Sequence, residues 1–125
     1  MWLPIFAIFF GAGFGALLRA GFNFLVAGSA SMIPLGTLLS NLVGGYLIGI
    51  AIAFFGNNPN LSPEWRLFVI TGFLGGLTTF SSFSAEIVTL MQRGEITWAL
   101  GTALLHLVGS LALTFLGILT YQALK

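Results

Sequence analysis

Uncharged hydrogen-bonding side chains recur at helical spacing in a chain that is otherwise apolar. Thr102, His106, Ser110 and Thr114 are each four residues apart, so a helix places them along one slowly winding face. Asn41 is a further uncharged donor in another apolar segment. Polar groups inside a membrane usually face a bundle interior or a wet cavity. Each could tie helices together singly, but their presence on several segments indicates a shared polar path. His106 is interpreted here as a neutral donor.

The segment from residue 72 to residue 84 combines glycines with hydroxyl side chains in the middle of an apolar stretch. Gly75 and Gly76 are adjacent, and Thr78 and Thr79 follow them. Adjacent glycines weaken a helix, and hydroxyls offer backbone groups alternative partners. A helix broken there would present carbonyls that suit a cation and N–H groups that suit an anion. An unbroken helix with a close glycine contact is the alternative, and physics alone leaves both open.

Phe80 and Phe83 are three residues apart, and Ser81 and Ser84 form a second pair with the same spacing beside them. On a helix this sets an aromatic stripe next to a hydroxyl stripe. Ring edges carry partial positive charge and hydroxyls donate hydrogen bonds, so the two stripes could accompany a small, dehydrated anion. A phenylalanine stripe in a membrane helix is more often packed or in contact with lipid, and the residues alone favour that simpler interpretation.

Arg19 and Glu86 are the charged residues inside apolar segments. Burying either charge alone is costly, so each is expected to pair or to extend toward the membrane surface. Glu86 lies about two turns before the end of its apolar segment. That position disfavours a central proton-coupling role for its carboxylate.

Composition places the chain in a membrane. Hydrophobic residues make up 58% of the chain and charged residues 6%, with a mean hydropathy of +1.06, whereas a soluble domain carries roughly a quarter charged residues. The four Lys and Arg residues are scattered singly and form no patch for nucleic acid. The absence of cysteine excludes disulfides, thiol catalysis and Cys-ligated metals. No nucleophile–base set or metal cluster is visible, so an enzyme is not expected.

The expected fold is a single all-α membrane domain over residues 1–125. A helix needs about 20 residues to cross the hydrocarbon core, and stretches rich in Gly, Pro, Asn or Ser separate four apolar segments of that length. We expect spans at about 3–27, 35–55, 64–91 and 96–124. Glycine pairs four residues apart let helix backbones approach closely. These pairs are Gly11 with Gly15, Gly45 with Gly49, and Gly72 with Gly76.

Four spans put both chain ends on one side of the membrane. The cationic side chains on that side are Arg66 and Lys125, and those on the other side are Arg93 and, if its side chain extends outward, Arg19. With two cationic side chains on each side, the positive-inside rule favours neither orientation of the chain. Insertion in both orientations would permit an antiparallel pair of copies. A weak bias toward one orientation is the alternative, and the count leaves both open.

Along its whole length the chain resembles the bacterial Fluc (CrcB) fluoride channels. The resemblance rests on Gly11 to Arg19 (Gly-x-x-x-Gly-Ala-x-x-Arg), on Gly36-Thr37-Leu38 with Asn41 and Gly44, and above all on the run from Gly75 to Ser84 followed by Glu86. The last motif is specific, whereas glycine spacings alone are weak. The resemblance implies passive fluoride export across a bacterial inner membrane by an antiparallel, dual-topology homodimer with two pores.

The resemblance also implies the site residues. It implies that the third helix is broken near its middle, where the backbone carbonyls of Gly75 and Thr78 would hold a structural sodium ion at the dimer centre. The family's paired pore phenylalanines correspond to Phe80 and Phe83, and its pore asparagine to Asn41. The implied polar track continues through Ser81, Ser84, Ser110 and Thr114. Ser82 stands where many members have Thr. His106 stands where a small hydroxyl residue is expected, which puts its place in the track in doubt.

Two other functions compete with a fluoride channel. A proton-coupled efflux transporter of the small multidrug kind also has four short helices, but it needs a titratable carboxylate in its first span, where this chain has Arg19. A non-transporting assembly subunit would use its polar faces only to bind partner helices. Conductance in a purified, reconstituted preparation discriminates the assembly subunit from either transport function.

Overall fold

The computed structural model describes all 125 residues, and every element is helical. Four helical segments are long and apolar enough to cross a membrane: Trp2–Leu25, Leu35–Asn57, Pro63–Gln92 and Ile96–Leu124. The prediction of an all-helical membrane protein with four spans is therefore confirmed. The first span ends two residues earlier than expected, at Leu25, and the second extends to Asn57. In chain order the elements are α1 (Trp2–Leu25), α2 (Leu35–Asn57), α3 (Pro63–Arg66), the π-helical η1 (Leu67–Leu74), α4 (Gly75–Leu77), α5 (Phe80–Gln92) and α6 (Ile96–Leu124).

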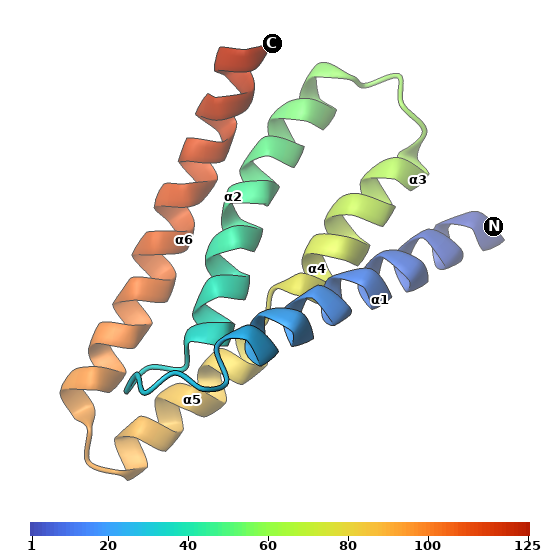
Figure 1. The fold of residues 1–125 in the computed structure, drawn as a ribbon. Coiled ribbons are helices and arrows are strands. Elements are labelled where there is room, and N and C mark those ends of the chain that lie inside the picture. Colours follow the sequence, from blue (N-terminus) through green and yellow to red (C-terminus); the bar gives the residue numbers. More distant parts are fainter.

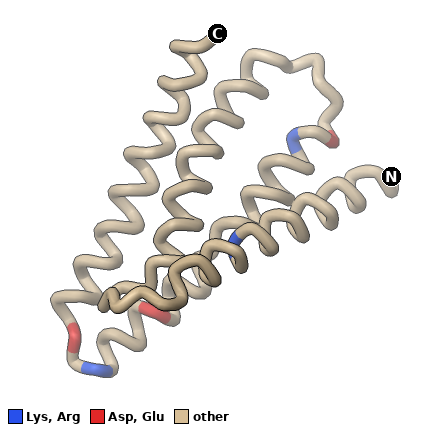
Figure 2. The backbone as a smooth tube through the Cα atoms, in the orientation of Figure 1, with Lys and Arg blue, Asp and Glu red and all other residues tan.

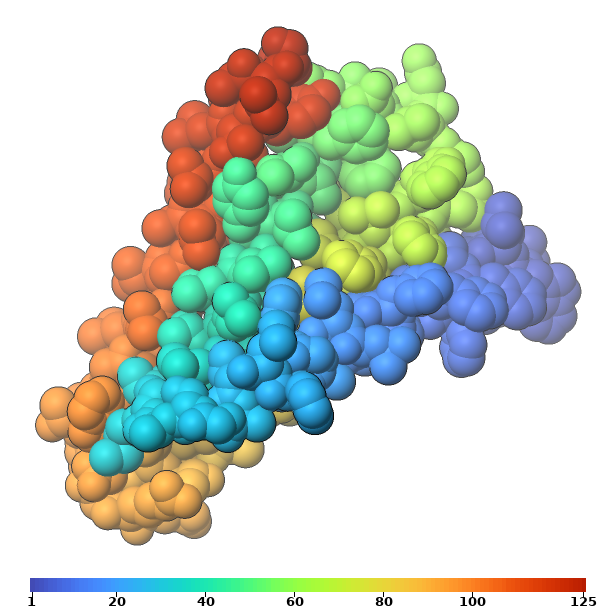
Figure 3. Space-filling model, in the orientation of Figure 1, coloured from blue at the N-terminus to red at the C-terminus, as the bar shows by residue number.

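The spans form two packed pairs. Helices α2 and α6 run side by side in the same direction, and α1 crosses against η1 and α4 (Figure 1). Helix α5 continues the third span beneath α2 and packs on α6. In the space-filling view the first span, in blue, lies directly against the yellow segment around α4 (Figure 3). The two ends of the chain lie toward the same end of the bundle, as four crossings require.

The third span is interrupted at Thr78 and Thr79, so the prediction of a broken helix is confirmed. Thr78 has φ −84° and ψ 156°, and Thr79 has φ −150° and ψ 123°, both extended backbone. Helix α5 then restarts at Phe80, and the Thr79 side chain caps it by accepting a hydrogen bond from the Ser82 N–H at 3.2 Å. The break lies near the middle of the span, away from either membrane surface.

Glycines bring the first and third spans into backbone contact. A Cβ at Gly15 would meet the Phe73 carbonyl oxygen and, at 2.7 Å, the Leu77 backbone nitrogen. A Cβ at Gly72 would lie 3.0 Å from the Gly11 Cα. The two predicted glycine pairs of these spans therefore pack against each other, and this contact fixes the half-helix that precedes the break.

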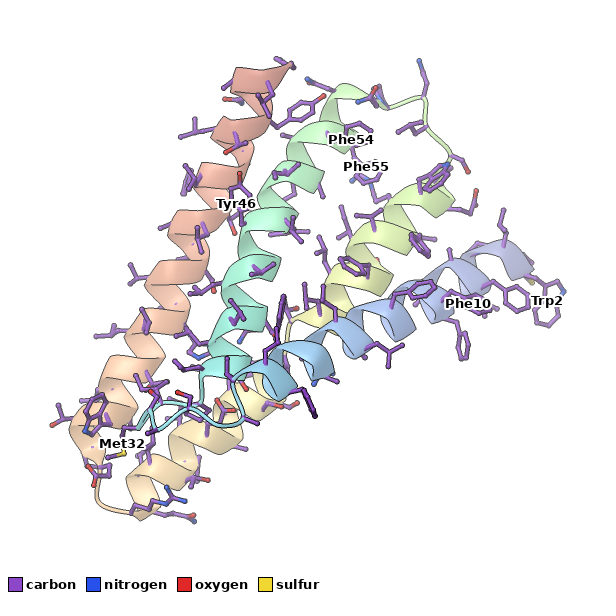
Figure 4. All side chains as sticks on the ribbon, viewed as in Figure 1. Trp2, Phe10, Met32, Tyr46, Phe54 and Phe55 are labelled. Carbon is purple, nitrogen blue, oxygen red and sulfur yellow. The ribbon has the colours of Figure 1, made fainter.

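A second glycine contact joins α2 to α6. A Cβ at Gly45 would lie 3.0 Å from the Ser110 carbonyl oxygen, and one at Gly49 would meet the Thr114 carbonyl oxygen. Gly117 on α6 faces the Tyr46 carbonyl in the same way. Tyr46 lies between the two helices (Figure 4) and donates a hydrogen bond to the Thr120 Oγ1 at 3.0 Å. Such close backbone contact leaves α2 and α6 little freedom to move against each other.

Charged residues are sparse and gather at the span ends, with two exceptions (Figure 2). Arg19 lies within α1 and Glu86 within α5, as expected. Apolar side chains, among them Trp2 and Phe10 of α1, project outward from the bundle (Figure 4). That apolar surface suits lipid, because lipid tails are an acceptable solvent for large hydrophobic side chains.

We predict that Gly15→Ala destabilises the protein by about 1–3 kcal/mol, because the methyl group must push the α1 and third-span backbones apart. Unfolding in detergent by SDS titration measures the change. Gly13→Ala on the same helix and Gly101→Ala on α6 are the matched controls, since a Cβ at either position meets nothing within 4 Å. Equal stability of Gly15→Ala and the controls would contradict the close contact.

Candidate functional site

A polar cavity of about 390 Å³ opens beside the break in the third span. Asn41 reaches it from α2, Phe80 and Phe83 from α5, and His106 from α6. A larger groove of about 470 Å³ between α1 and α3 is almost wholly apolar and lies away from these groups. The polar cavity is therefore the candidate site. Its lining residues are Asn41, Gly45, Ile48, Thr78, Thr79, Phe80, Phe83, His106, Leu107, Ser110, Leu111 and Thr114.

The Asn41 side chain hydrogen-bonds to the Thr79 backbone through both its amide oxygen and its amide nitrogen. The Thr79 N–H donates to Asn41 Oδ1 at 2.8 Å, and Asn41 Nδ2 donates to the Thr79 carbonyl oxygen at 3.1 Å. Asn41 Nδ2 also lies 3.1 Å from His106 Nδ1. The side chain thus supplies the partners that a neighbouring turn would supply in an unbroken helix. An asparagine amide has two N–H groups, and both are directed at protein atoms.

The break deprives several carbonyl groups of their usual helical donors, Gly75 and Thr78 among them. In a continuous helix the Thr79 N–H would bond to the Gly75 carbonyl, but it donates to Asn41 instead. The Ser82 N–H would bond to the Thr78 carbonyl, but it donates to Thr79 Oγ1. At the break, the carbonyl oxygens of Gly75 and Thr78 therefore lack the N–H donors that a continuous helix would give them.

Arg19 supports the other side of the break. Its Nε donates to the Gly76 carbonyl oxygen at 3.1 Å across the contact between α1 and α4. Of the two arrangements expected for Arg19, pairing or extension toward the membrane surface, the structure shows pairing, with a backbone carbonyl. A guanidinium at the carbonyl end of a half-helix also complements the negative end of its dipole.

Three rings line the cavity in succession. The Phe83 ring centroid lies 4.6 Å from the His106 ring and 5.5 Å from the Phe80 ring. His106 is almost fully buried, whereas Phe80 is 77% exposed in the single protomer. The aromatic pair therefore extends from the buried imidazole to the open side of the cavity. The structure does not bury Phe80 in a protein core.

Two hydroxyl residues of α6 line the cavity wall. Thr114 Oγ1 lies 2.9 Å from both the Gly45 and Ser110 carbonyl oxygens, and its proton can be donated to either. Ser110 is half-buried and its hydroxyl has no hydrogen bond within the protein. A free hydroxyl on a rigid backbone is a suitable donor to a small ligand. These two side chains occupy the positions that the sequence pattern indicated.

The structure does not bring Ser81 and Ser84 to the cavity lining. Ser81 is exposed, and its Oγ lies 3.3 Å from Thr79 Oγ1, beside the cap of α5. Ser84 is half-buried on α5. The three-residue spacing correctly places the two serines on one helix face, but in the single protomer that face does not form the wall of the cavity.

Sequence reasoning missed Thr37 and Ser40 of α2, which lie buried with polar groups of three residues it did single out, Glu86, Thr102 and His106. Thr37 donates a short hydrogen bond to the Glu86 carboxylate, which joins α2 to α5. Ser40 and Thr102 are each 0% exposed, and their hydroxyl oxygens have no hydrogen-bond partner, like Glu86 Oε1 and His106 Nε2. The available signal was the four-residue step from Thr37 to Asn41, which repeats the step from Thr102 to His106 on the neighbouring helix.

Comparison with known proteins identifies the family of the chain. Residues 6–118 match the family model described as CrcB-like protein, Camphor Resistance (CrcB). The chain belongs to the CrcB-like family. A protein of Polynucleobacter asymbioticus named fluoride-specific ion channel FluC is 80% identical over the full length of both chains. Proteins with the same name from Tolumonas auensis and Nitrosomonas europaea are 57% and 55% identical, and each match covers all of this chain and 98% of the relative.

Proposed function

We propose that this CrcB-like protein is a fluoride-selective ion channel, a transport protein rather than an enzyme, which exports fluoride passively and so relieves its toxicity. The observation that carries the proposal is the cavity at the break, where uncharged donors and aromatic rings meet in mid-membrane. The full-length likeness to proteins named as fluoride-specific channels supports it independently.

The physical requirement for fluoride transport is replacement of strongly held water. A small anion can cross the membrane only where hydrogen-bond donors substitute for its hydration shell. Ser110 and the first N–H groups of α5 are candidate donors, because the first N–H groups of a helix have no intrahelical partner. The edges of the Phe80 and Phe83 rings add partial positive charge. No fixed cation lines the cavity, so the anion is not trapped there.

We infer that two copies assemble as an antiparallel homodimer. In one protomer the cavity is open and Phe80, which lines it, is 77% exposed. A second copy would close the cavity. With Arg19 bonded inside the bundle, Arg66 and Lys125 face only Arg93 across the membrane, a difference of one charge that imposes little bias against either orientation. The bacterial inner membrane is the proposed location, with lipid against the outer apolar face, because helical spans of this length suit it.

A structural sodium ion is the proposed cofactor at the dimer centre. The carbonyl oxygens of Gly75 and Thr78 would hold it, and they fit because the break has taken away their helical donors. Gly75 is also exposed in the single protomer, as a group shared between two copies must be. A bound cation would raise the local potential for an anion and join the subunits.

The function is tested by fluoride efflux from liposomes that contain the purified protein. We expect rapid fluoride loss and no chloride loss. Phe80→Ile should slow efflux about tenfold by removing the ring edge, and Asn41→Ala should slow it at least as much because the break loses its partner. Phe115→Ile, at an exposed aromatic outside the cavity, is the matched control. Absence of efflux from folded, dimeric protein would favour the assembly or multidrug alternatives.

Orientation is tested with a single cysteine, because the chain has none of its own. In intact cells that express Ser31→Cys, in the segment between α1 and α2, a membrane-impermeant thiol reagent should label about half of the molecules if both orientations insert equally. Permeabilised cells provide the control for complete labelling. Labelling of all molecules, or of none, in intact cells would show a single orientation and rule out the antiparallel pair.

Sodium dependence is tested by purifying the protein without sodium and measuring its residual sodium by elemental analysis. Sodium-free protein should lose at least about tenfold in fluoride efflux, and sodium should restore the rate. Thr78→Ala is the matched variant, since it removes a hydroxyl that donates to the Leu74 carbonyl but keeps the Thr78 carbonyl. It should therefore keep the same sodium dependence. Full efflux from demonstrably sodium-free protein would contradict the site.

A further inference from the structure

The orientation of the Asn41 amide is determined by the backbone of the break. Thr79 presents an N–H to one side of the amide and a carbonyl oxygen to the other, at 2.8 Å and 3.1 Å. A reversed amide would place N–H against N–H and oxygen against oxygen. The oxygen of Asn41 must therefore face the Thr79 N–H, and its nitrogen must face both the Thr79 carbonyl and His106.

That orientation determines the tautomer of the histidine. Asn41 Nδ2 lies 3.1 Å from His106 Nδ1. An amide nitrogen carries two protons and accepts no hydrogen bond. His106 Nδ1 must therefore be the acceptor, so the single proton of a neutral imidazole resides on Nε2. A cationic ring would carry a proton on Nδ1 as well, which would oppose the Asn41 N–H.

We propose that His106 is a positioning residue: its unprotonated Nδ1 accepts a hydrogen bond from Asn41 and thereby holds the amide that holds the helix break. This inference rests on the proposed fluoride-channel function, which it deepens by assigning to position 106 the role of holding Asn41 and not that of contacting the ion. In the single protomer the imidazole therefore acts on the helix break indirectly, through its hydrogen bond with Asn41.

The surroundings of the ring support this role. The Phe83 ring lies 4.6 Å from the imidazole, tilted by 43° to it, and restricts its orientation. His106 Nε2 is buried without a hydrogen-bond partner, so Asn41 is the only side chain that bonds to the imidazole. The Glu86 carboxylate accepts a hydrogen bond from Thr37 rather than from the imidazole.

The tautomer is measured directly by solid-state NMR of tag-free protein labelled with ¹⁵N-histidine and reconstituted in lipid. The chain has one histidine, so each ring nitrogen gives one assignable signal. We expect a protonated Nε2 and an unprotonated Nδ1 at neutral pH. In Asn41→Asp the carboxylate would accept from both Thr79 and the imidazole, so the proton should appear on Nδ1. A proton on Nδ1 in the wild type would overturn the proposal.

Fluoride efflux from two variants of His106 tests whether this residue positions Asn41 or itself donates a hydrogen bond. His106→Asn keeps an acceptor near the place of Nδ1, and His106→Gln keeps a donor near the place of Nε2 but not that acceptor. We expect His106→Asn to remain within about threefold of the wild-type rate and His106→Gln to slow about tenfold, as loss of one hydrogen bond predicts. Equal slowing of both, or a faster His106→Gln, would overturn the positioning role.

Tyr46→Phe is the matched control, because it removes a different side-chain hydrogen bond between α2 and α6, that from Tyr46 to Thr120, outside the cavity. It should change neither the nitrogen signals nor the efflux rate. The channel function and the positioning role of His106 can each be refuted without refuting the other. A wild-type protein that moves no fluoride would refute the channel function, whereas the nitrogen signals would still decide whether Asn41 fixes the imidazole.

Discussion

The whole arrangement depends on one constraint: backbone N–H and carbonyl groups in the middle of a membrane need partners. A broken helix at that depth leaves such groups without their usual bonds. Asn41 from α2 satisfies two of them at Thr79, and Arg19 from α1 satisfies another at Gly76. The break is therefore stable only because two neighbouring helices are close enough to reach it. The glycine contacts of α1 with the third span provide that closeness on one side.

The same bonds determine which groups stay free. Because Asn41 directs both N–H groups at protein atoms, an anion in the cavity would first meet other donors, such as the Ser110 hydroxyl and the N–H groups that begin α5. The Gly75 and Thr78 carbonyls lose their helical donors at the same break. One interruption thus supplies both carbonyls that suit a cation and N–H groups that suit an anion, although no charged side chain lines the cavity.

Much of this architecture could be predicted from the sequence because membranes restrict the choices. Span length and apolar composition predict four helices, and the glycine pairs predict close contacts. The break was only one of two open alternatives, because Gly75, Gly76 and the threonines are compatible with either a kink or a packed helix. The role of Asn41 as a partner of Thr79 could not be predicted, because it depends on how two segments 38 residues apart are placed. Ser81 and Ser84 were assigned to the path from helical spacing, which specifies a face but not what covers that face.

Rigidity of the cavity wall has a consequence for discrimination between anions. Gly45, Gly49 and Gly117 bring the backbones of α2 and α6 into contact, and Thr114 bonds across that contact to the Gly45 carbonyl. Donors attached to such a wall cannot move apart to suit a larger ion without losing these contacts, since close-packed interiors deform little. The cavity lining has no charged side chain that would attract anions in general, so discrimination between anions there must come from neutral groups and from the limited freedom of this wall.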